Sequence, residues 1–363
     1  MNYDGRVYFI GAGASKQDRF PLTGELKHGL AWAIREEPER FAILARHLEY
    51  LYHVRDKTFE KSADIWENLS DLPSDAPPAR CQIPDVTDLL STLDWTIREQ
   101  SSFGPGLDTR AEKRSPIDEL PEVRDLVVQA LCYCLGRYHD LHNASKTEEF
   151  VNLVRPTDSL ITTNWDLLID AARHRKFGSQ PDDYGTTANV VLQETADTGD
   201  SLIATESVRP KLLKLHGSLS WRYCQRCQRL VIDPLHHVAG DRKDSCECTY
   251  SYSELIVTPG FVREYRNIHL LTIWREALLA LASASQWIFI GYSLPPDDVG
   301  IRTLLLKGRC VRNDIGNGPP SVTIVTGNNG EATRARYLGI FADVKLFEGD
   351  FGQFVDQKGG EIL

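Results

Sequence analysis

The sequence predicts an α/β fold, in which a parallel sheet is combined with a helical insertion and a small zinc module held by four cysteines. Three observations support this prediction. Short apolar runs recur along the chain, and helical patterns lie between the later ones. A series of amphipathic helices separates the first apolar run from the second. Four cysteines stand in two close pairs, a spacing that is typical of tetrahedral zinc sites.

The apolar runs are predicted to be buried strands of one parallel sheet. Alternation of strands and helices at this spacing places helices on both faces of such a sheet. Ligands bind at the carboxyl ends of its strands, where the polar motifs of this chain stand. The runs span residues 7–13, 158–164, 211–217, 254–260, 287–293 and 321–327, with 343–350 as one more candidate, and the later helical patterns span 268–285, 298–309 and 331–341.

Residues 25–155 have a different character and are predicted to form a helical insertion after the first strand. Four segments, at 24–37, 38–54, 85–100 and 121–142, place their apolar residues on one helical face. The sequence leaves open whether this insertion is an assembly surface or a lid. The apolar stripe of the last segment comprises Val123, Leu126, Val127, Ala130, Leu131, Cys134, Leu135 and Tyr138.

Composition and charge narrow the possible functions. The chain of 363 residues is 42% hydrophobic and 25% charged, as is usual for a soluble globular protein. Its net charge of −10 gives no overall attraction to nucleic acid or to an anionic membrane. The N-terminal segment lacks the features of a signal peptide, and no apolar run approaches the roughly 20 residues of a membrane span. We therefore expect a cytoplasmic protein.

Four cysteines form the strongest local motif. Cys224 and Cys227 are separated by two residues, and Cys246 and Cys248 by one. Four thiolates close a tetrahedral shell, so the expected metal is a structural Zn²⁺. A disulfide pair is disfavoured in a reducing compartment. His236 and His237 lie between the pairs and could replace one ligand, but they are expected to be spectators. The remaining cysteines are expected to be core or surface thiols: Cys81, Cys132, Cys134 and Cys310.

A glycine-rich turn, GAGAS at 11–15, follows the first predicted strand directly. Gly11 and Gly13 permit a tight turn and a close approach of the backbone to a pyrophosphate, and the helix that follows supplies free N–H groups. The Gly-x-Gly pattern alone is a weak signal, because a turn without a ligand can have the same glycines. Its position after the first strand favours phosphate binding.

Polar residues end the next two predicted strands. Asn164 and Asp166 lie in ITTNWD, where an Asn can hold a ribose hydroxyl or a water and an Asp can accept a hydrogen bond from a carboxamide. The alternative is that they cap the following helix. His216 precedes Gly217 at the end of KLLKLHG. A histidine titrates near neutrality and suits a general base if it faces a cleft, whereas a lone histidine is more often structural.

Two later strands end in comparable motifs. GYSLPPDD at 291–298 supplies Gly291 for a close approach and Ser293 for a phosphate or a ribose. The alternative is a turn in which one of the aspartates caps the next helix. TGNNG at 326–330 supplies Asn328 for a second ribose, with a simple Gly-Asn turn as the alternative.

The order of these motifs resembles that of the sirtuin family. GAGAS resembles the first NAD loop of that family, and TTNWD resembles its Thr-Gln-Asn-Ile-Asp box. The pair at 216–217 is similar to the catalytic His-Gly of the family, and GYSL is similar to its Gly-Thr-Ser-Leu segment. VTGNN and EGDF are similar to segments on the adenine side. The resemblance covers most of the chain outside the insertion. It implies a Rossmann-like NAD-binding domain at 1–24, 156–222 and 251–363, a helical insertion at 25–155 and a zinc module at 223–250.

The resemblance also implies roles for individual residues. Asn164 is expected to orient a water or hold the nicotinamide ribose, and His216 to act as the base on a ribose hydroxyl or on water. Asp166 is expected to hold the nicotinamide carboxamide. NAD is then the substrate and Zn²⁺ a structural ion. The implied NAD-binding residues are Gly11, Ala12, Gly13, Ser15, Thr163, Asp166, Gly291, Ser293, Asn328 and Phe351.

Departures from the protein-deacylating sirtuins favour one activity. DRFPLTGEL at 18–26 lacks their Asp-Phe-Arg, and TPGFVREYRN at 258–267 lacks the Phe-Gly-Glu of their peptide-binding segment. These features are similar to divergent bacterial antiphage proteins that hydrolyse NAD and often form homo-oligomers or act with a partner such as a hexameric ATPase. The expected function is an NAD⁺ glycohydrolase that releases nicotinamide and ADP-ribose. The alternatives are an NAD-dependent protein-lysine deacylase and a non-catalytic NAD or ADP-ribose sensor.

Overall fold

The chain forms two compact units, each of which is described by itself. The computed structural model describes residues 5–69, 83–101, 116–140, 145–178, 181–187, 189–190, 209–237, 245–260, 265–327 and 330–357. The first unit comprises Met1–Asp18, Asn143–Ile256 and Tyr265–Leu363. The second comprises Arg19–His142 and Val257–Glu264.

A six-stranded parallel sheet forms the centre of the first unit, which confirms the predicted fold class. Its strand order is β10-β9-β8-β1-β2-β4. The chain moves from β1 toward β2 and β4 and later from β8 toward β9 and β10, so the winding direction reverses between β1 and β8, where such sheets bind ligands. The strands are β1 (Arg6–Ile10), β2 (Ser159–Thr162), β4 (Lys211–Lys214), β8 (Gln286–Ile290), β9 (Ser321–Val325) and β10 (Lys345–Phe347).

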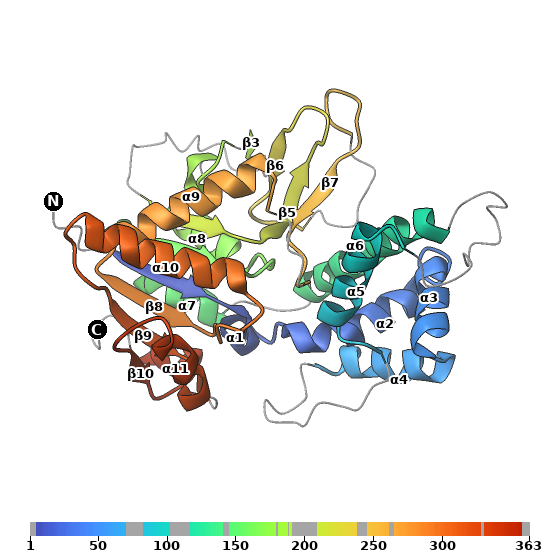
Figure 1. Ribbon diagram of the computed structural model, residues 1–363, viewed down its shortest axis with the longest axis horizontal. Coiled ribbons are helices and arrows are strands. Elements are labelled where there is room, and N and C mark those ends of the chain that lie inside the picture. The colour runs from blue at the N-terminus through green and yellow to red at the C-terminus, as the bar shows by residue number, and fades with distance from the viewer. Residues whose placement is uncertain are drawn as a thin grey trace. The chain divides into compact units, whose positions relative to one another are not determined.

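Helices cover both faces of this sheet (Figure 1). On one face lie α9 (Ile268–Ser283) and α10 (Val299–Asp314), and on the other α7 (Ser145–Leu153) and α8 (Leu168–Phe177). The predicted helical patterns after residue 265 correspond to α9, α10 and α11. The shorter elements of this unit are α1 (Ala12–Ser15), η1 (Lys16–Asp18), η4 (Pro181–Tyr184), α11 (Gly330–Leu338) and α12 (Phe351–Asp356).

Large aromatic side chains fill the space between the sheet and the helices. Phe9 of β1 is fully buried, and its ring lies 5.4 Å from Phe289 and 4.8 Å from Tyr292, measured between ring centroids. Trp287 of β8 is also fully buried, and its Nε1 donates to the Leu281 carbonyl at 3.0 Å. Residues on both faces of β1 and β8 are buried, as expected for central strands of a parallel sheet.

A second, four-stranded sheet has the order β3-β6-β5-β7. The run at 254–260 was predicted to join the parallel sheet, and this prediction is wrong. Its strand, β7, pairs antiparallel with β5. The segment between β5 and β7 contains the four cysteines and folds back on itself, so the two strands meet as neighbours. The strands are β3 (Asn189–Val190), β5 (Gly217–Tyr223), β6 (Leu230–Ile232) and β7 (Ser253–Ile256).

The second unit is helical. Its α2 packs against α4 and α6, and a Cβ on Gly29 of α2 would lie 2.8 Å from the Trp66 ring, so these helices approach closely. The helix α4 was not predicted, and α7, which the predicted insertion includes, lies in the first unit. We propose that this unit is the insertion. Its elements are η2 (Thr23–Glu25), α2 (Leu26–Glu36), α3 (Ala42–Tyr52), α4 (Asp56–Glu67), α5 (Val86–Arg98) and α6 (Pro116–Asp140).

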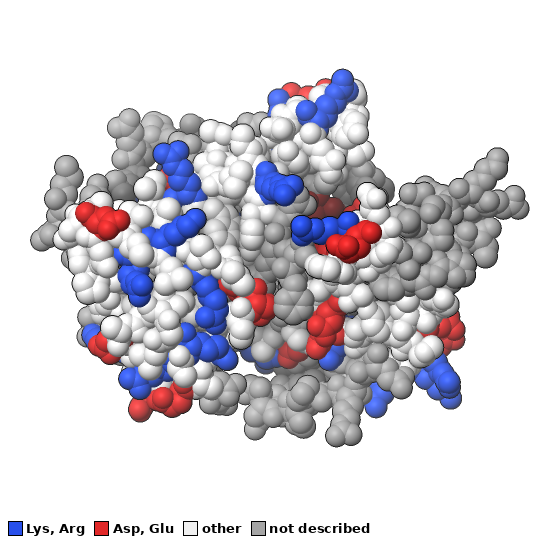
Figure 2. All heavy atoms as spheres, viewed as in Figure 1, with Lys and Arg blue, Asp and Glu red and all other residues white. Residues whose placement is uncertain are grey.

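The surface shows no single dominant field of charge in the view of Figure 2. Lys and Arg side chains are interspersed with acidic and uncharged ones over the described part of the face that carries α9 and α10. Among the described residues, no helix is long and apolar enough to cross a membrane.

The carboxyl ends of β1 and β8 approach so closely that side chains do not fit between them. Gly13 N donates to the Gly291 carbonyl at 2.9 Å, and Gly11 N donates to the Ile290 carbonyl at 2.9 Å. Gly291 has a φ of +62°, and a Cβ built on it would lie 2.1 Å from the Ala14 backbone nitrogen. The turn after β1 therefore requires glycine on both strands.

Two glycine substitutions separate backbone strain from steric overlap. Gly316 has a φ of +81° but open space around its Cβ position, so Gly316→Ala is expected to cost about 1 kcal/mol of unfolding free energy. Gly291→Ala adds a collision with backbone atoms and is expected to cost about 3 kcal/mol or more. Urea unfolding followed by circular dichroism measures both. Equal costs for the two variants would contradict the close approach of β1 and β8.

Candidate functional site

A short turn connects β1 to the residues that carry the first polar group of the site. Gly11 is followed by α1, which ends at Ser15, and Ala12 and Gly13 are partly exposed along the turn. Ser15 itself is buried, with 5% of its surface exposed. The turn therefore presents backbone at its surface and directs the Ser15 hydroxyl inward.

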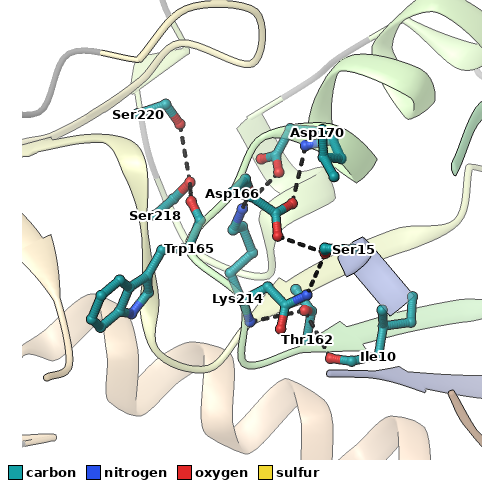
Figure 3. A network of polar contacts seen from close by, with 11 residues as sticks. Ile10, Ser15, Thr162, Trp165, Asp166, Asp170, Lys214, Ser218 and Ser220 are labelled. Carbon is teal, nitrogen blue, oxygen red and sulfur yellow. Dashed lines mark hydrogen bonds and ion pairs between the residues drawn. The ribbon is translucent and has the colours of Figure 1, made fainter. Parts of the chain in front are cut away.

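A chain of hydrogen bonds joins this turn to the loop after β2 (Figure 3). The Ser15 Oγ donates to the Asp166 Oδ2 at 2.8 Å and accepts from the Asn164 Nδ2 at 2.9 Å. All three side chains are buried. The structure thus brings together Ser15 of the GAGAS motif with Asn164 and Asp166 of the ITTNWD motif, and we call these three residues the Asp166–Ser15–Asn164 chain.

The direction of this chain fixes the orientation of the Asn164 amide. An ionised Asp166 can only accept, so the single Ser15 proton points to Asp166 and the Ser15 oxygen accepts from the Asn164 NH₂ group. The Asn164 Oδ1 then remains as an acceptor with no hydrogen-bond partner among the described residues, and it is not sealed from solvent. This oxygen can orient a water or a hydroxyl group.

Backbone contacts hold the loop after β2 in place. The Thr162 hydroxyl donates to the Ile10 carbonyl at 2.9 Å and accepts from the Asn164 backbone N at 3.0 Å. Asp166 Oδ1 accepts from the Leu168 N at 3.1 Å, so Asp166 also satisfies the first turn of α8. One oxygen of the Asp166 carboxylate, Oδ1, thus contacts the first turn of α8, as the capping alternative proposed. The other oxygen, Oδ2, belongs to the hydrogen-bond chain of the site.

The surroundings of Asp166 act on its pKa in both directions. Burial raises the pKa of Asp166 above its usual value, and the positive charge of Lys214 and the hydrogen bonds from Ser15 and Leu168 offset only part of this rise. The Lys214 side chain lies beneath the loop and donates to the Asp166 carbonyl. Lys214 was not predicted as a site residue, although a lysine inside the apolar run KLLKLHG is itself an indication of a buried partner.

His216 lies where the chain passes from one sheet to the other. It follows β4, the neighbour of β2, and precedes Gly217, the first residue of β5. Gly217 has a φ of +75°, and its Cβ position would lie 1.9 Å from the Leu255 carbonyl oxygen, so the turn requires glycine. His216 is 8% exposed, and Tyr265 places its hydroxyl 3.5 Å from the His216 Nε2.

The predicted residues that follow β8 differ in their exposure and in their contacts. Ser293 is exposed, and its carbonyl accepts from Arg336 Nε at 2.7 Å. Tyr292, which was not predicted, is buried and donates through its hydroxyl to Asp298 at 2.6 Å. Asp298 in turn caps α10, as the alternative for this motif proposed.

The remaining predicted contacts with NAD lie on different parts of the chain. Thr163 is half-buried, and its backbone N lies 3.4 Å from the Ile10 carbonyl oxygen. Phe351 is buried in the core, where its ring meets Phe150 edge-on at 5.5 Å between centroids. Asn328 and Cys81 lie outside the described residues.

The four predicted cysteine ligands converge. Their sulfur atoms all lie within 4.8 Å of one another, and the pairs Cys224–Cys248 and Cys227–Cys246 are each 3.4 Å apart. Hydrogen bonds lower the pKa of Cys224 and lower that of Cys246 to about 6, which favours the thiolate that binds metal, whereas hydrogen bonds with neighbouring thiols raise the pKa of Cys227 and of Cys248. The four-cysteine cluster therefore fits a structural zinc site.

Two tight turns and a histidine hold this cluster on the second sheet. The turns include Gln228 at φ +57° and Thr249 at φ +68°, each one residue after a cysteine. His269 of α9 donates from Nε2 to the Gln228 carbonyl at 2.7 Å, because a carbonyl can only accept. His236 lies beside Asp233 at 3.2 Å and is not part of the cluster, in agreement with its prediction as a spectator.

Comparison with known proteins gives a family for this arrangement. The family model described as "SIR2-like domain" matches residues 158–341, just over half of the chain. Of the solved structures, a Sir2–p53 peptide–NAD⁺ complex is 14% identical, with a TM-score of 0.42 over 99% of this chain and 94% of that chain. An ADP-ribose complex of a mutant Sir2 homologue is also 14% identical, with a TM-score of 0.45 over 98% and 91%. No curated protein sequence matches the chain.

The zinc site is tested by removing one ligand. Cys246→Ser is expected to abolish binding of about one zinc ion per chain and to lower the free energy of unfolding by about 3 kcal/mol or more. Cys310→Ser, at an exposed cysteine of α10, is the matched control and is expected to keep both. Elemental analysis and urea unfolding measure the two quantities. Stoichiometric zinc in the Cys246 variant would contradict the assignment of that ligand.

Proposed function

The chain belongs to the family of SIR2-like domains, and from this premise we propose that it is an NAD⁺ glycohydrolase that releases nicotinamide and ADP-ribose. The proposal rests mainly on one observation. The Asp166–Ser15–Asn164 chain leaves an amide oxygen available beside the glycine turn at the switch point of the sheet. His216 follows the adjacent strand, at the same edge of the sheet.

The glycine turn supports the placement of the substrate. A pyrophosphate would lie over the backbone at Ala12 and Gly13, which is partly exposed and has no bulky side chain. The nicotinamide ribose would then extend toward the ends of β2 and β4, where Asn164, Asp166 and His216 stand. The adenosine would extend the other way, over the ends of β8 and β9.

The chemistry requires little acid catalysis. Nicotinamide in NAD⁺ is already cationic, so cleavage of its bond to C1 of the ribose releases a neutral leaving group and leaves an oxocarbenium-like sugar. Water adds to that carbon and loses one proton, which balances the reaction as NAD⁺ and water giving nicotinamide, ADP-ribose and a proton. We assign Asn164 to the orientation of this water and His216 to the removal of its proton.

The segment after β7 supports hydrolysis without a peptide substrate. An acyl-lysine peptide binds to such a domain by adding a strand to an exposed edge. Here β7 is itself an edge strand of the second sheet, but it ends at Ile256, and the described residues 257–260, in the segment without the Phe-Gly-Glu motif, form no strand. Tyr265, further along this segment, instead places its hydroxyl near His216.

The biological setting extends this proposal. Similarity of the sequence motifs to antiphage proteins that hydrolyse NAD supports a role in bacterial defence by depletion of NAD in the cytoplasm. Such an activity has to be restrained in a healthy cell, and assembly into a homo-oligomer or with a partner such as a hexameric ATPase would provide the restraint. The helical unit is a surface on which assembly could occur.

Substitution of the proposed base tests the mechanism. His216→Ala is expected to lower the rate of nicotinamide release from NAD⁺ by at least ~100-fold, because the variant lacks the group that we assign to removal of the proton from water. His236→Ala is the matched control, since His236 is exposed and lies apart from the site. Chromatography of nicotinamide and ADP-ribose, with circular dichroism to verify folding, provides the measurement. Full activity of folded His216→Ala protein would refute the role of this residue.

A second experiment distinguishes the classes of function. The purified protein is expected to release nicotinamide from NAD⁺ alone, at a rate that an acetyl-lysine peptide leaves unchanged. Release that requires the peptide would instead show a deacylase. A non-catalytic sensor would bind NAD⁺, as measured by calorimetry, but would release no nicotinamide with or without the peptide. It would also release none after extracts that contain candidate partners are added.

A further inference from the structure

Lys214 is a buried charged residue to which the proposed mechanism gives no role. It lies at the end of β4, two residues before His216, and its side chain is 1% exposed. Lysine is almost never fully buried unless it is paired, because removal of the ammonium group from water is costly. Its position therefore needs an explanation in terms of its partners.

The partners of Lys214 lie on the loop and the helix that follow β2. Its Nζ donates to the Asp166 backbone carbonyl and forms an ion pair with the Asp170 Oδ2 at 2.7 Å. The Asp170 side chain has no exposed surface. Figure 3 shows the lysine reaching from its strand to both acidic residues. One side chain thus ties the strand that precedes His216 to the loop that carries Asn164.

Other charged groups nearby are paired among themselves. Tyr184 of η4 lies near Asp170, and burial together with the Asp170 charge raises the pKa of Tyr184, which stays neutral. Arg173, one turn further along α8, pairs with Asp183 at 2.6 Å and donates to the Pro210 carbonyl at 2.7 Å. Of these groups, Lys214 is the cation that faces Asp166 directly.

We propose that Lys214 is a positioning residue for the reaction, which holds the loop after β2 and keeps the Asp166–Ser15–Asn164 chain in the direction that presents the Asn164 oxygen to water. This inference rests on the proposed function. Lys214 touches neither substrate nor water in this account. It acts through the Asp166 carbonyl and through its charge.

The electrostatics support this role. Lys214 lowers the pKa of Asp166 and so opposes the effect of burial. If Asp166 gains a proton, it can donate to Ser15, Ser15 can donate to the Asn164 oxygen, and the amide then presents its NH₂ group instead. Activity is therefore lost as the pH falls through the pKa of Asp166. The negative charge of Asp170 raises this pKa by less than Lys214 lowers it. Removal of Lys214, alone or together with Asp170, therefore raises the pKa of Asp166, and the loss of activity begins at a higher pH.

The test separates positioning from simple structural support. Lys214→Met alone leaves Asp170 buried without its cation and is expected to fold poorly. The double variant Lys214→Met, Asp170→Leu removes both charges and is therefore expected to fold. Its kcat at pH 7 is nevertheless expected to be about 10- to 100-fold lower than that of wild type. The acidic limb of its pH–rate profile is expected to lie at a higher pH. Lys211→Met, on the exposed end of the same strand, is the matched control and is expected to behave as wild type.

Recovery of the wild-type kcat and pH profile in the folded double variant would overturn the proposal. Lys214 and Asp170 would then be a structural ion pair without a role in the reaction. A second measurement needs no turnover. The ¹³C resonance of the Asp166 carboxyl in the ligand-free protein is expected to show an ionised group at pH 7 and to titrate at a higher pH in the double variant than in wild type; a protonated group in wild type, or an unchanged titration in the variant, would equally overturn the proposal. Wild-type protein that releases no nicotinamide would contradict the proposed function, while this comparison of ¹³C titrations would still decide the role of Lys214.

Discussion

The site depends on one hydrogen bond, from the Ser15 hydroxyl to the Asp166 carboxylate. It connects the turn after β1 with the loop after β2, although the two residues are 151 positions apart in the sequence. Because the carboxylate only accepts, this bond determines which end of the Asn164 amide is available. The orientation of one amide therefore depends on the ionisation of a buried acid, and that ionisation depends on the nearby lysine.

The backbone around this bond is arranged to stay fixed. The approach of Gly13 to Gly291 sets the separation of β1 and β8, and Thr162 connects the ends of β1 and β2. Groups held in this way need little reorganisation when charge develops on a substrate, which is how electrostatic stabilisation by an enzyme is most effective. The same backbone contacts thus make the sheet edge rigid and hold the groups of the proposed reaction in place.

Much of the fold could be predicted because its signals are local. The apolar runs that became β1, β2 and β8 and the cysteine pairs each depend on residues close in sequence. The segment at 254–260 was misassigned because an apolar run does not show which sheet it joins. The helix α4 was missed because its sequence, DKTFEKSADIWE, is rich in charge. The polar residues at the strand ends were predicted from local motifs, but the partners of Lys214 depend on a fold that brings together positions 44 apart.

The central claim is that water held at the Asn164 oxygen attacks C1 of the nicotinamide ribose. Its most direct test is a brief reaction of the purified protein with NAD⁺ in H₂¹⁸O, followed by mass spectrometry of ADP-ribose, with authentic ADP-ribose in the same water as the control for exchange. The account predicts ¹⁸O at C1 of the released ribose in the enzymatic product beyond that control. Nicotinamide release that yields ADP-ribose without the label, or a product joined to another acceptor, would contradict it.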